Sequence, residues 1–241
     1  MGKRSSFARF ERDAYDTPLS AVSPLRRHLP KHFTFCEPCA GRGALVDHLV
    51  ALGGACTAAY DIAPRRAGIG TKDAGDLTLA ALKGADFNIT NTPWSRPVLH
   101  DLIVRLSDLR PSWLLIDADW IHTLQSIPYQ RRLRRVQSIG RVKWIEGSKS
   151  TGKDNACWYL FDRPSNQPTL FYGRMPSSEV TQPRHSGTAR PSSIKRPEIM
   201  PGGSACSVTL RSSWAQLWFP PGKRPGAGDA GPVRSKATAS K

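Results

Sequence analysis

The stretch that decides the fold is Phe33-Thr34-Phe35-Cys36-Glu37-Pro38-Cys39-Ala40-Gly41-Arg42-Gly43. Its apolar, β-forming start predicts a buried strand over 33–37. The spacing of Leu45, Val46, Leu49 and Val50 predicts a helix over 44–52 that begins directly after the second glycine. Glycines at this point let the backbone turn tightly and approach a ligand closely. The stretch therefore predicts the strand–turn–helix unit that opens an α/β domain.

Short apolar runs and amphipathic stretches continue to alternate further along the chain. The pattern predicts strands over 55–61, 85–90 and 113–117, and helices over 77–82 and 97–109. A helical segment that ends in several arginines should follow residue 117, and two closing strands are expected over 141–146 and 157–162. Strands that alternate with helices predict a mostly parallel sheet with helices on both faces.

The composition changes near residue 163. From there to residue 241 the chain holds 12 Lys and Arg against 3 Asp and Glu, dense Pro, Gly and Ser, and one aromatic island at 214–219. This composition predicts a basic, disordered tail, because too little apolar surface is available to form a core. We therefore expect a folded domain over 1–162 and a tail over 163–241.

The charge of the chain limits its partners. Lys and Arg outnumber Asp and Glu by 35 to 19, a net charge of +16, which predicts a polyanionic partner such as nucleic acid or an anionic membrane surface. The sequence has no apolar run long enough to span a membrane, and no apolar region follows the basic N-terminus, so we expect neither a membrane span nor a secretory signal. The five scattered cysteines favour a reducing cytoplasm. Cys36 and Cys39 lack further ligands nearby, so no metal is expected.

The first half of a candidate site lies around the glycine turn. Glu37, Gly41 and Gly43 surround the start of the predicted helix, whose amides can hold an anionic group. Asp61, at the end of the next strand, suits the hydroxyls of a ribose, and Asp76 would follow a third strand where a carboxylate can accept from an adenine amine. A dinucleotide fingerprint is disfavoured because Val46 stands where a third small residue is needed. The alternative is a purely structural turn.

The second half is Asn91-Thr92-Pro93-Trp94, directly after the predicted strand 85–90. An amide oxygen, a backbone carbonyl and a flat ring at the end of a strand suit a conjugated NH2 group. Hydrogen bonds from that group to Asn91 and to the carbonyl of Thr92 favour the geometry in which its lone pair is localised. Trp94 can stack on a base. The alternative is a turn in which the proline ends a strand and the tryptophan covers the core.

Taken together, these residues resemble the S-adenosylmethionine-dependent adenine-N6 DNA methyltransferases, especially the small phage and plasmid type. The similarity covers roughly residues 12–162 and includes Tyr15-Asp16-Thr17-Pro18, which is similar to the N-terminal cofactor motif of that family. It implies a Rossmann-like methyltransferase fold, S-adenosyl-L-methionine as the cofactor, DNA as the partner and methylation of adenine N6. The residues that it implies for the cofactor are Tyr15, Thr17, Glu37, Gly41, Gly43, Asp61 and Asp76, and for catalysis Asn91, Thr92, Pro93 and Trp94.

The chain departs from this family at two points. Thr92 stands where the family has its first proline, so the carbonyl is retained but a less rigid loop is expected. The chain also lacks room for a separate recognition domain, so readout of DNA sequence should be short or weak.

The densest basic run of the predicted domain is Arg131, Arg132, Arg134 and Arg135, which we interpret as contacts to phosphates. The alternative is a solvated helix end. Two other functions stay open: a methyltransferase for RNA bases or protein glutamine, because the tetrad suits any planar NH2 group, and a non-catalytic nucleic-acid-binding protein on the same fold.

Overall fold

The computed structural model describes residues 15–145, 147 and 151–175. All of them belong to one compact unit, Met1–Gly187, whereas a second unit, Thr188–Lys241, lies outside the described residues. The predicted aromatic island and most of the predicted tail therefore also lie outside them. Within the described ranges, no helix combines the length and the apolar character needed to cross a membrane.

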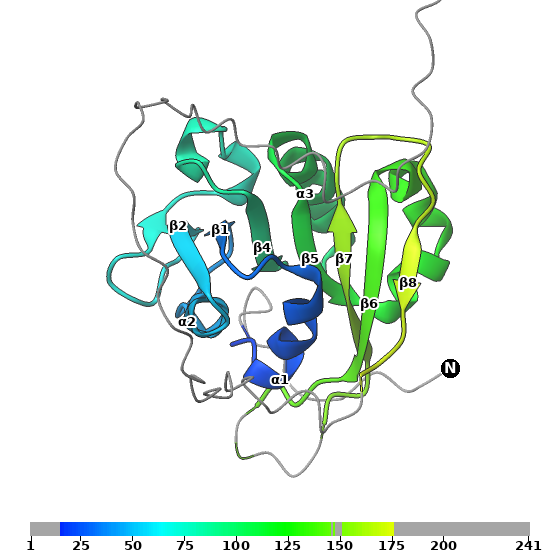
Figure 1. Cartoon of the computed structure of the whole chain (residues 1–241), viewed down its shortest axis with the longest axis horizontal. Helices are drawn as coiled ribbons and strands as arrows, with labels where there is room; N and C mark the ends of the chain where they lie inside the picture. Colours follow the sequence, from blue (N-terminus) through cyan, green and yellow to red (C-terminus); the bar gives the residue numbers. More distant parts are fainter. Residues whose placement is uncertain (1–14, 146, 148–150, 176–241) are drawn as a thin grey trace, which may run out of the picture. The chain divides into compact units, whose positions relative to one another are not determined.

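The core of the described unit is a single mixed sheet with the strand order β3-β2-β1-β4-β5-β7-β6-β8 (Figure 1). Only β7 runs antiparallel to its neighbours, and the other pairs are parallel. The strands are β1 Phe33–Glu37, β2 Gly54–Asp61, β3 Gly70–Thr71, β4 Phe87–Asn91, β5 Ser112–Asp117, β6 Leu133–Arg141, β7 Asn155–Phe161 and β8 Leu170–Tyr172.

Helices cover both faces of this sheet. The α-helices are α1 Leu19–Val22, α2 Ala44–Ala51 and α3 Arg96–Leu109, and the 3-10 helices are η2 Ser23–His28, η3 Ala74–Asp76, η4 Ala80–Leu82, η5 Ala118–His122 and η6 Leu124–Arg132. Alternate residues of one strand enter different cores: Trp113 and Leu115 pack with α1, η2 and α2, whereas Leu114 and Ile116 pack with α3 and η5. The predicted Rossmann-like fold, a mostly parallel sheet with helices on both faces, is confirmed.

Four predictions of elements and boundaries were wrong. The segment 77–82 forms only the 3-10 turn η4, which ends at Leu82 and is followed by Lys83 and Gly84, both with positive φ. The strand β6 runs over Leu133–Arg141, so neither a helix through residue 135 nor a strand over 141–146 forms. Its two register shifts break the alternation of apolar and polar residues that would have revealed it. Finally, β8 lies inside the predicted tail and pairs with β6, so the folded part extends beyond residue 162.

The order of the strands creates a crevice at one edge of the sheet. From β1 the chain moves outward to β2 and β3, and it then returns to the other side of β1 to form β4 and β5. Ligands of open α/β sheets bind at such a reversal, beyond the carboxyl ends of the strands. The ends that meet there are Glu37 of β1 and Asn91 of β4.

Candidate functional site

A cavity of about 640 Å³ opens at this reversal. Its volume is in the range of small-molecule and cofactor sites. Seven of the residues predicted from sequence line it: Tyr15, Thr17, Glu37, Gly41, Asp61, Asn91 and Pro93. Apolar side chains such as Leu45, Val98 and Leu102 form part of its wall. The fold thus joins residues from both predicted halves of the site in one cavity.

The glycine turn is braced by Asp61 at the end of β2. One carboxylate oxygen of Asp61 accepts from the Gly41 amide at 2.7 Å, and the other accepts from the Ala63 amide at 2.8 Å. Gly41 has a φ of +54°, which a residue with a side chain rarely adopts. Asp61 therefore fixes the backbone of the turn and still presents carboxylate lone pairs at the cavity.

Glu37 is the most unusual group in the cavity wall. It is only 2% exposed, and its Oε2 accepts no hydrogen bond from any described residue. Burial, and then the negative charge of Asp61, raise the pKa of Glu37 well above its ordinary value, although a hydrogen bond from the Val46 backbone opposes this. A buried carboxyl with one oxygen that lacks a partner suits a ligand that brings a hydrogen-bond donor or a positive charge.

Two predicted cofactor residues do not line this cavity. Gly43 has a φ of +80° at the start of α2, where it serves the turn, and it lies beside Arg66. Asp76 is exposed in η3. The third strand ends at Thr71, so the acidic residue that follows it into the cavity is Asp73. The two-residue strand was too short to appear as an apolar run. The prediction therefore selected Asp76, which does not line the cavity, and not Asp73, which does.

The N-terminal segment closes one side of the cavity. Tyr15 and Thr17 line it, and Thr17 is buried. Asp16 forms an ion pair with Arg65 at 3.6 Å, and the backbone amide of Arg65 donates to Gly41 at 2.9 Å. The sequence analysis missed Arg65, which lines the cavity from the loop after β2. Its position two residues before a glycine-rich stretch gives no signal of this role.

The tetrad splits into two cavity residues and two anchors. Asn91 and Pro93 line the cavity, and the side chain of Asn91 makes no hydrogen bond to a described residue. The Thr92 hydroxyl and the Trp94 indole both donate to the carbonyl of Leu115 in β5, at 3.4 and 3.1 Å. The loop with threonine in place of proline is therefore tied to the sheet by side chains. Trp94 does not line the cavity, and its ring instead meets Trp144 edge to face at 5.9 Å.

The four arginines predicted to contact phosphates lie at the opposite edge of the sheet. Leu133 at the start of β6 is level with Phe161 of β7, and so is Ser112 at the start of β5. Arg131, Arg132, Arg134 and Arg135 flank that starting point, while Asn91 and Glu37 lie at strand ends. The structure therefore does not bring these arginines to the cavity.

The cysteines near the cavity remain thiols. Burial raises the pKa of both Cys36 and Cys39 to about 12, so neither is poised to be a thiolate at neutral pH. Among the described residues, no group of three or more His, Cys, Asp or Glu side chains is arranged to hold a metal ion.

No protein-family model and no curated protein sequence matches the chain. Three solved methyltransferase structures are similar to it. A Listeria monocytogenes protein assigned to the class I S-adenosylmethionine-dependent methyltransferases has 10% identity and a TM-score of 0.43, covering 69% of this chain and 67% of its own. The M protein of the type I restriction enzyme EcoKI has 10% identity and a TM-score of 0.43, covering 67% and 49%. A precorrin-6y C5,15-methyltransferase from Geobacter metallireducens has 12% identity and a TM-score of 0.39, covering 59% and 87%.

The chain thus spans about half the length of the EcoKI M protein. All three TM-scores lie below 0.5 and no identity exceeds 12%, so a functional proposal has to rest on the geometry of the cavity.

Proposed function

We propose that this chain binds S-adenosyl-L-methionine in the cavity and transfers the methyl group to N6 of adenine in DNA. The observation that carries the proposal is the meeting of Asn91 and Pro93 with Glu37, Gly41 and Asp61 around one cavity at the reversal of the sheet. If the cavity bound only a small molecule, Asn91 would not be expected to present it with an amide oxygen that has no partner among the described residues. If the segment 91–94 were only a structural turn, it would not be expected to line a cavity.

The residues present fit S-adenosylmethionine. The partnerless Glu37 Oε2 can accept from an ammonium group, and the lone pairs of Asp61 can accept from ribose hydroxyls. The positive φ of Gly41 lets the turn lie close to the ligand without a side chain in the way. When bound, this cofactor supplies an electrophilic methyl group that leaves its sulfur as the bond to the acceptor nitrogen forms.

The acceptor side rests on Asn91. The lone pair of an adenine amine is delocalised into the ring, which makes it a poor nucleophile. Hydrogen bonds from this amine to the Asn91 side-chain oxygen and the Thr92 carbonyl would favour the tetrahedral geometry in which the lone pair is localised. Fixed positioning beside the methyl donor supplies much of the remaining acceleration. The extra proton of the product can pass to solvent, so no dedicated base is required.

The choice of nucleic acid rests on charge. The net charge of +16 suits a polyanion, whose binding releases counterions. A base within a duplex must leave the stack before it reaches a cavity, at a cost of a few kcal/mol. The same tetrad would accept an RNA base, so DNA and RNA must be compared directly.

The test uses the full-length protein. Isothermal titration calorimetry should show binding of S-adenosylmethionine, and tritium transfer should label adenine-containing DNA in preference to RNA when the two compete. Digestion and mass spectrometry of the product should identify N6-methyladenine. Binding without transfer to either nucleic acid would overturn the proposed reaction, and absence of cofactor binding would favour a non-catalytic protein on this fold.

A further inference from the structure

An aromatic side chain outside the predicted tetrad packs beside Tyr15, which lines the cavity. Trp144, in the loop after β6, has its ring 6.3 Å from that of Tyr15 and 5.9 Å from that of Trp94. Tyr15 lines the cavity, and Trp94 follows Pro93, which also lines it. Trp144 is half-buried, so part of its surface faces solvent.

The returning part of the same loop packs against Trp144. The amide of Gly152 donates to the carbonyl of Val142 at 2.8 Å. A Cβ atom at Gly152 would lie 3.1 Å from the Trp144 ring, so glycine allows the chain to lie directly against the indole. The backbone at Gly152 therefore packs directly against one edge of the Trp144 indole.

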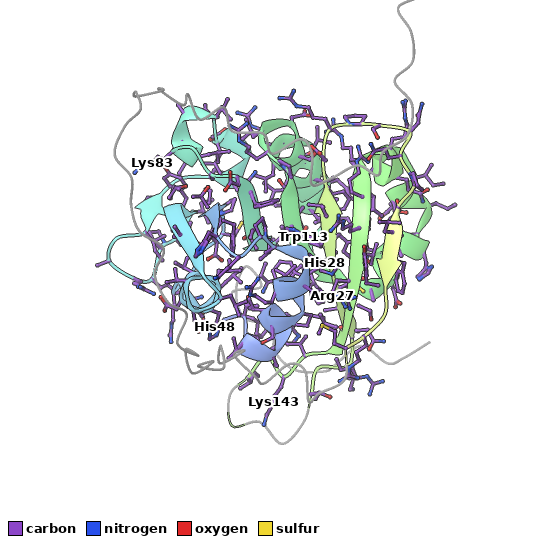
Figure 2. The ribbon with its side chains drawn as sticks, in the orientation of Figure 1. Arg27, His28, His48, Lys83, Trp113 and Lys143 are labelled. Carbon is purple, nitrogen blue, oxygen red and sulfur yellow. The ribbon has the colours of Figure 1, made fainter. Side chains whose placement is uncertain are left out.

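Four exposed cations lie near Trp144 along the chain or at the end of β6. Lys143 directly precedes it, Arg141 ends β6, and Lys153 follows Gly152. Arg174 reaches the same end of β6, where its Nη1 lies 3.2 Å from the position of a Cβ on Gly140. Figure 2 shows Lys143 on the loop beyond the end of β6, directed away from the sheet. None of the four forms an ion pair with an acidic side chain among residues 15–145, 147 and 151–175. We call Arg141, Lys143, Trp144, Lys153 and Arg174 the rim cluster.

The arginines at the opposite edge differ in this respect. Arg132 pairs with Asp108 at 2.6 Å and also donates to Ser107. Arg134 donates to the backbone carbonyls of Arg131 and Arg163, and Arg131 donates to Asn166 at 3.2 Å. Their hydrogen-bonding capacity is partly used within the protein, and they lie far along the strands from the cavity mouth.

We infer that the rim cluster is the surface that holds the nucleic-acid strand beside the cavity, with a base stacked on Trp144 and flanking phosphates on Lys143, Lys153 and their neighbours. This inference rests on the proposed function for the identity of the cavity. An exposed indole face next to basic side chains is the arrangement that binds single-stranded nucleic acid with little dependence on sequence. It also fits a base that has left the duplex, because the neighbouring unpaired strand then needs a stacking partner.

The test compares two matched double variants of the full-length protein, K143Q/K153Q at the rim and R131Q/R135Q at the opposite edge. Each removes two positive charges. Binding of a fluorescein-labelled, adenine-containing oligodeoxynucleotide, single-stranded and duplex, is followed by anisotropy at several salt concentrations. For the rim variant, the slope of log affinity against log salt should fall by about 1.4 for the single strand, because each phosphate that the protein no longer neutralises lowers it by about 0.7. The opposite-edge variant should keep the wild-type slope.

Trp144 is tested in the same assay. Trp144→Leu keeps an apolar contact for Trp94 but removes the stacking face, and we expect roughly tenfold weaker binding. Trp144→Phe should restore most of it. Circular dichroism checks that each variant folds. A 5-iodouracil oligonucleotide should also crosslink to Trp144 under long-wavelength light, which separates the rim from any contribution of residues 176–241.

The outcomes separate this inference from the proposed reaction. If the wild type binds the oligonucleotide through the rim cluster but transfers no methyl group, the inferred binding surface stands and the proposed reaction is wrong. The inference is overturned if the two double variants behave alike, if only R131Q/R135Q weakens binding, if crosslinks avoid the rim, or if the wild type binds neither form of the oligonucleotide.

Discussion

The two edges of the sheet use polar side chains in opposite ways. The amino edge is the end of the sheet at which the parallel strands begin, and the carboxyl edge is the end at which they finish. At the amino edge, the arginines around Leu133 bond to Asp108, Ser107, Asn166 and backbone carbonyls. At the carboxyl edge, Glu37 Oε2 is buried without a hydrogen-bond partner among the described residues, and the half-buried Asn91 lines the same cavity. A buried carboxylate oxygen that has no partner and lines a cavity suits a ligand. Substitutions at the amino edge should therefore affect stability, and those at the carboxyl edge should affect function.

The largest effect is expected at Asn91. Asn91→Ala should lower the rate of methyl transfer by roughly 100- to 1000-fold, the size seen when one hydrogen-bonding group at a reacting centre is removed. Binding of S-adenosylmethionine and the melting temperature should stay near wild type, because the side chain bonds to no described residue. Asn166→Ala, the same change at the amino edge, is the matched control. Near-normal turnover of Asn91→Ala would disprove the proposed role.

At the amino edge, Arg132→Ala should give the reverse pattern. The side chain is 14% exposed and joins Asp108 and Ser107, so its loss should destabilise the protein by about 1–3 kcal/mol. For a chain of this size that corresponds to a fall of roughly 2–4 °C in melting temperature for each kcal/mol. Calorimetry should show the lower stability. Turnover, measured about 20 °C below the melting temperature of the variant so that it stays folded, should be unchanged. A large loss of turnover would contradict the comparison.

A substitution of Glu37 should change both the stability of the protein and its binding of the cofactor, and the change in stability should depend on pH. Because its pKa is raised in the folded state, the folded protein holds its proton at pH values where the unfolded chain has lost it. Stability from this group is full below the ordinary glutamate pKa and declines as pH rises towards the raised value. Glu37→Gln, which imitates the protonated form, should therefore raise the melting temperature of the ligand-free protein more at pH 8 than at pH 5.

The same substitution should weaken binding of S-adenosylmethionine about tenfold, since a neutral amide attracts an ammonium group less than a carboxylate does. Calorimetric titration at pH 8 measures this. Equal melting-temperature differences at both pH values would show that the Glu37 carboxyl is not protonated by burial.

The smallest effect is expected at Thr92. Thr92→Val removes a 3.4 Å hydrogen bond to Leu115, while Trp94 retains its own bond to the same carbonyl. Stability should fall by about 0.5–1 kcal/mol. Turnover should fall less than threefold, about 0.6 kcal/mol in activation free energy. Denaturant unfolding and steady-state kinetics check both, and a loss comparable with that of Asn91→Ala would mean that Trp94 alone cannot hold the loop.

Local patterns explain which parts of this molecule could be predicted. The strand β1 and the turn at Gly41 follow from a short apolar run and two glycines, and the structure has that strand over the expected residues. Asp73 was missed because β3 has only two residues and is defined by its pairing with β2. The strand β6 was misplaced because its register shifts hide the alternation.

Arg134 and Arg135 lie at the start of a strand and not at the end of a helix. A helix that follows a parallel strand ends where the next strand begins, so either assignment places these arginines at the amino edge of the sheet. Trp144 could not be selected from sequence either, because its importance comes from rings contributed by Tyr15 and Trp94, which are distant along the chain. Spacing within the sequence carries no information on such contacts.

The shared carbonyl of Leu115 has a mechanical consequence. Thr92 and Trp94 are both anchored to it, so the loop that follows Asn91 is tied to the central strand β5 at two points. On the other side of the cavity, Asp16 and Arg65 form a partly exposed ion pair, a kind of contact worth about 0–1 kcal/mol. In the proposed reaction, the anchoring at Leu115 would keep the acceptor side of the cavity aligned from one turnover to the next.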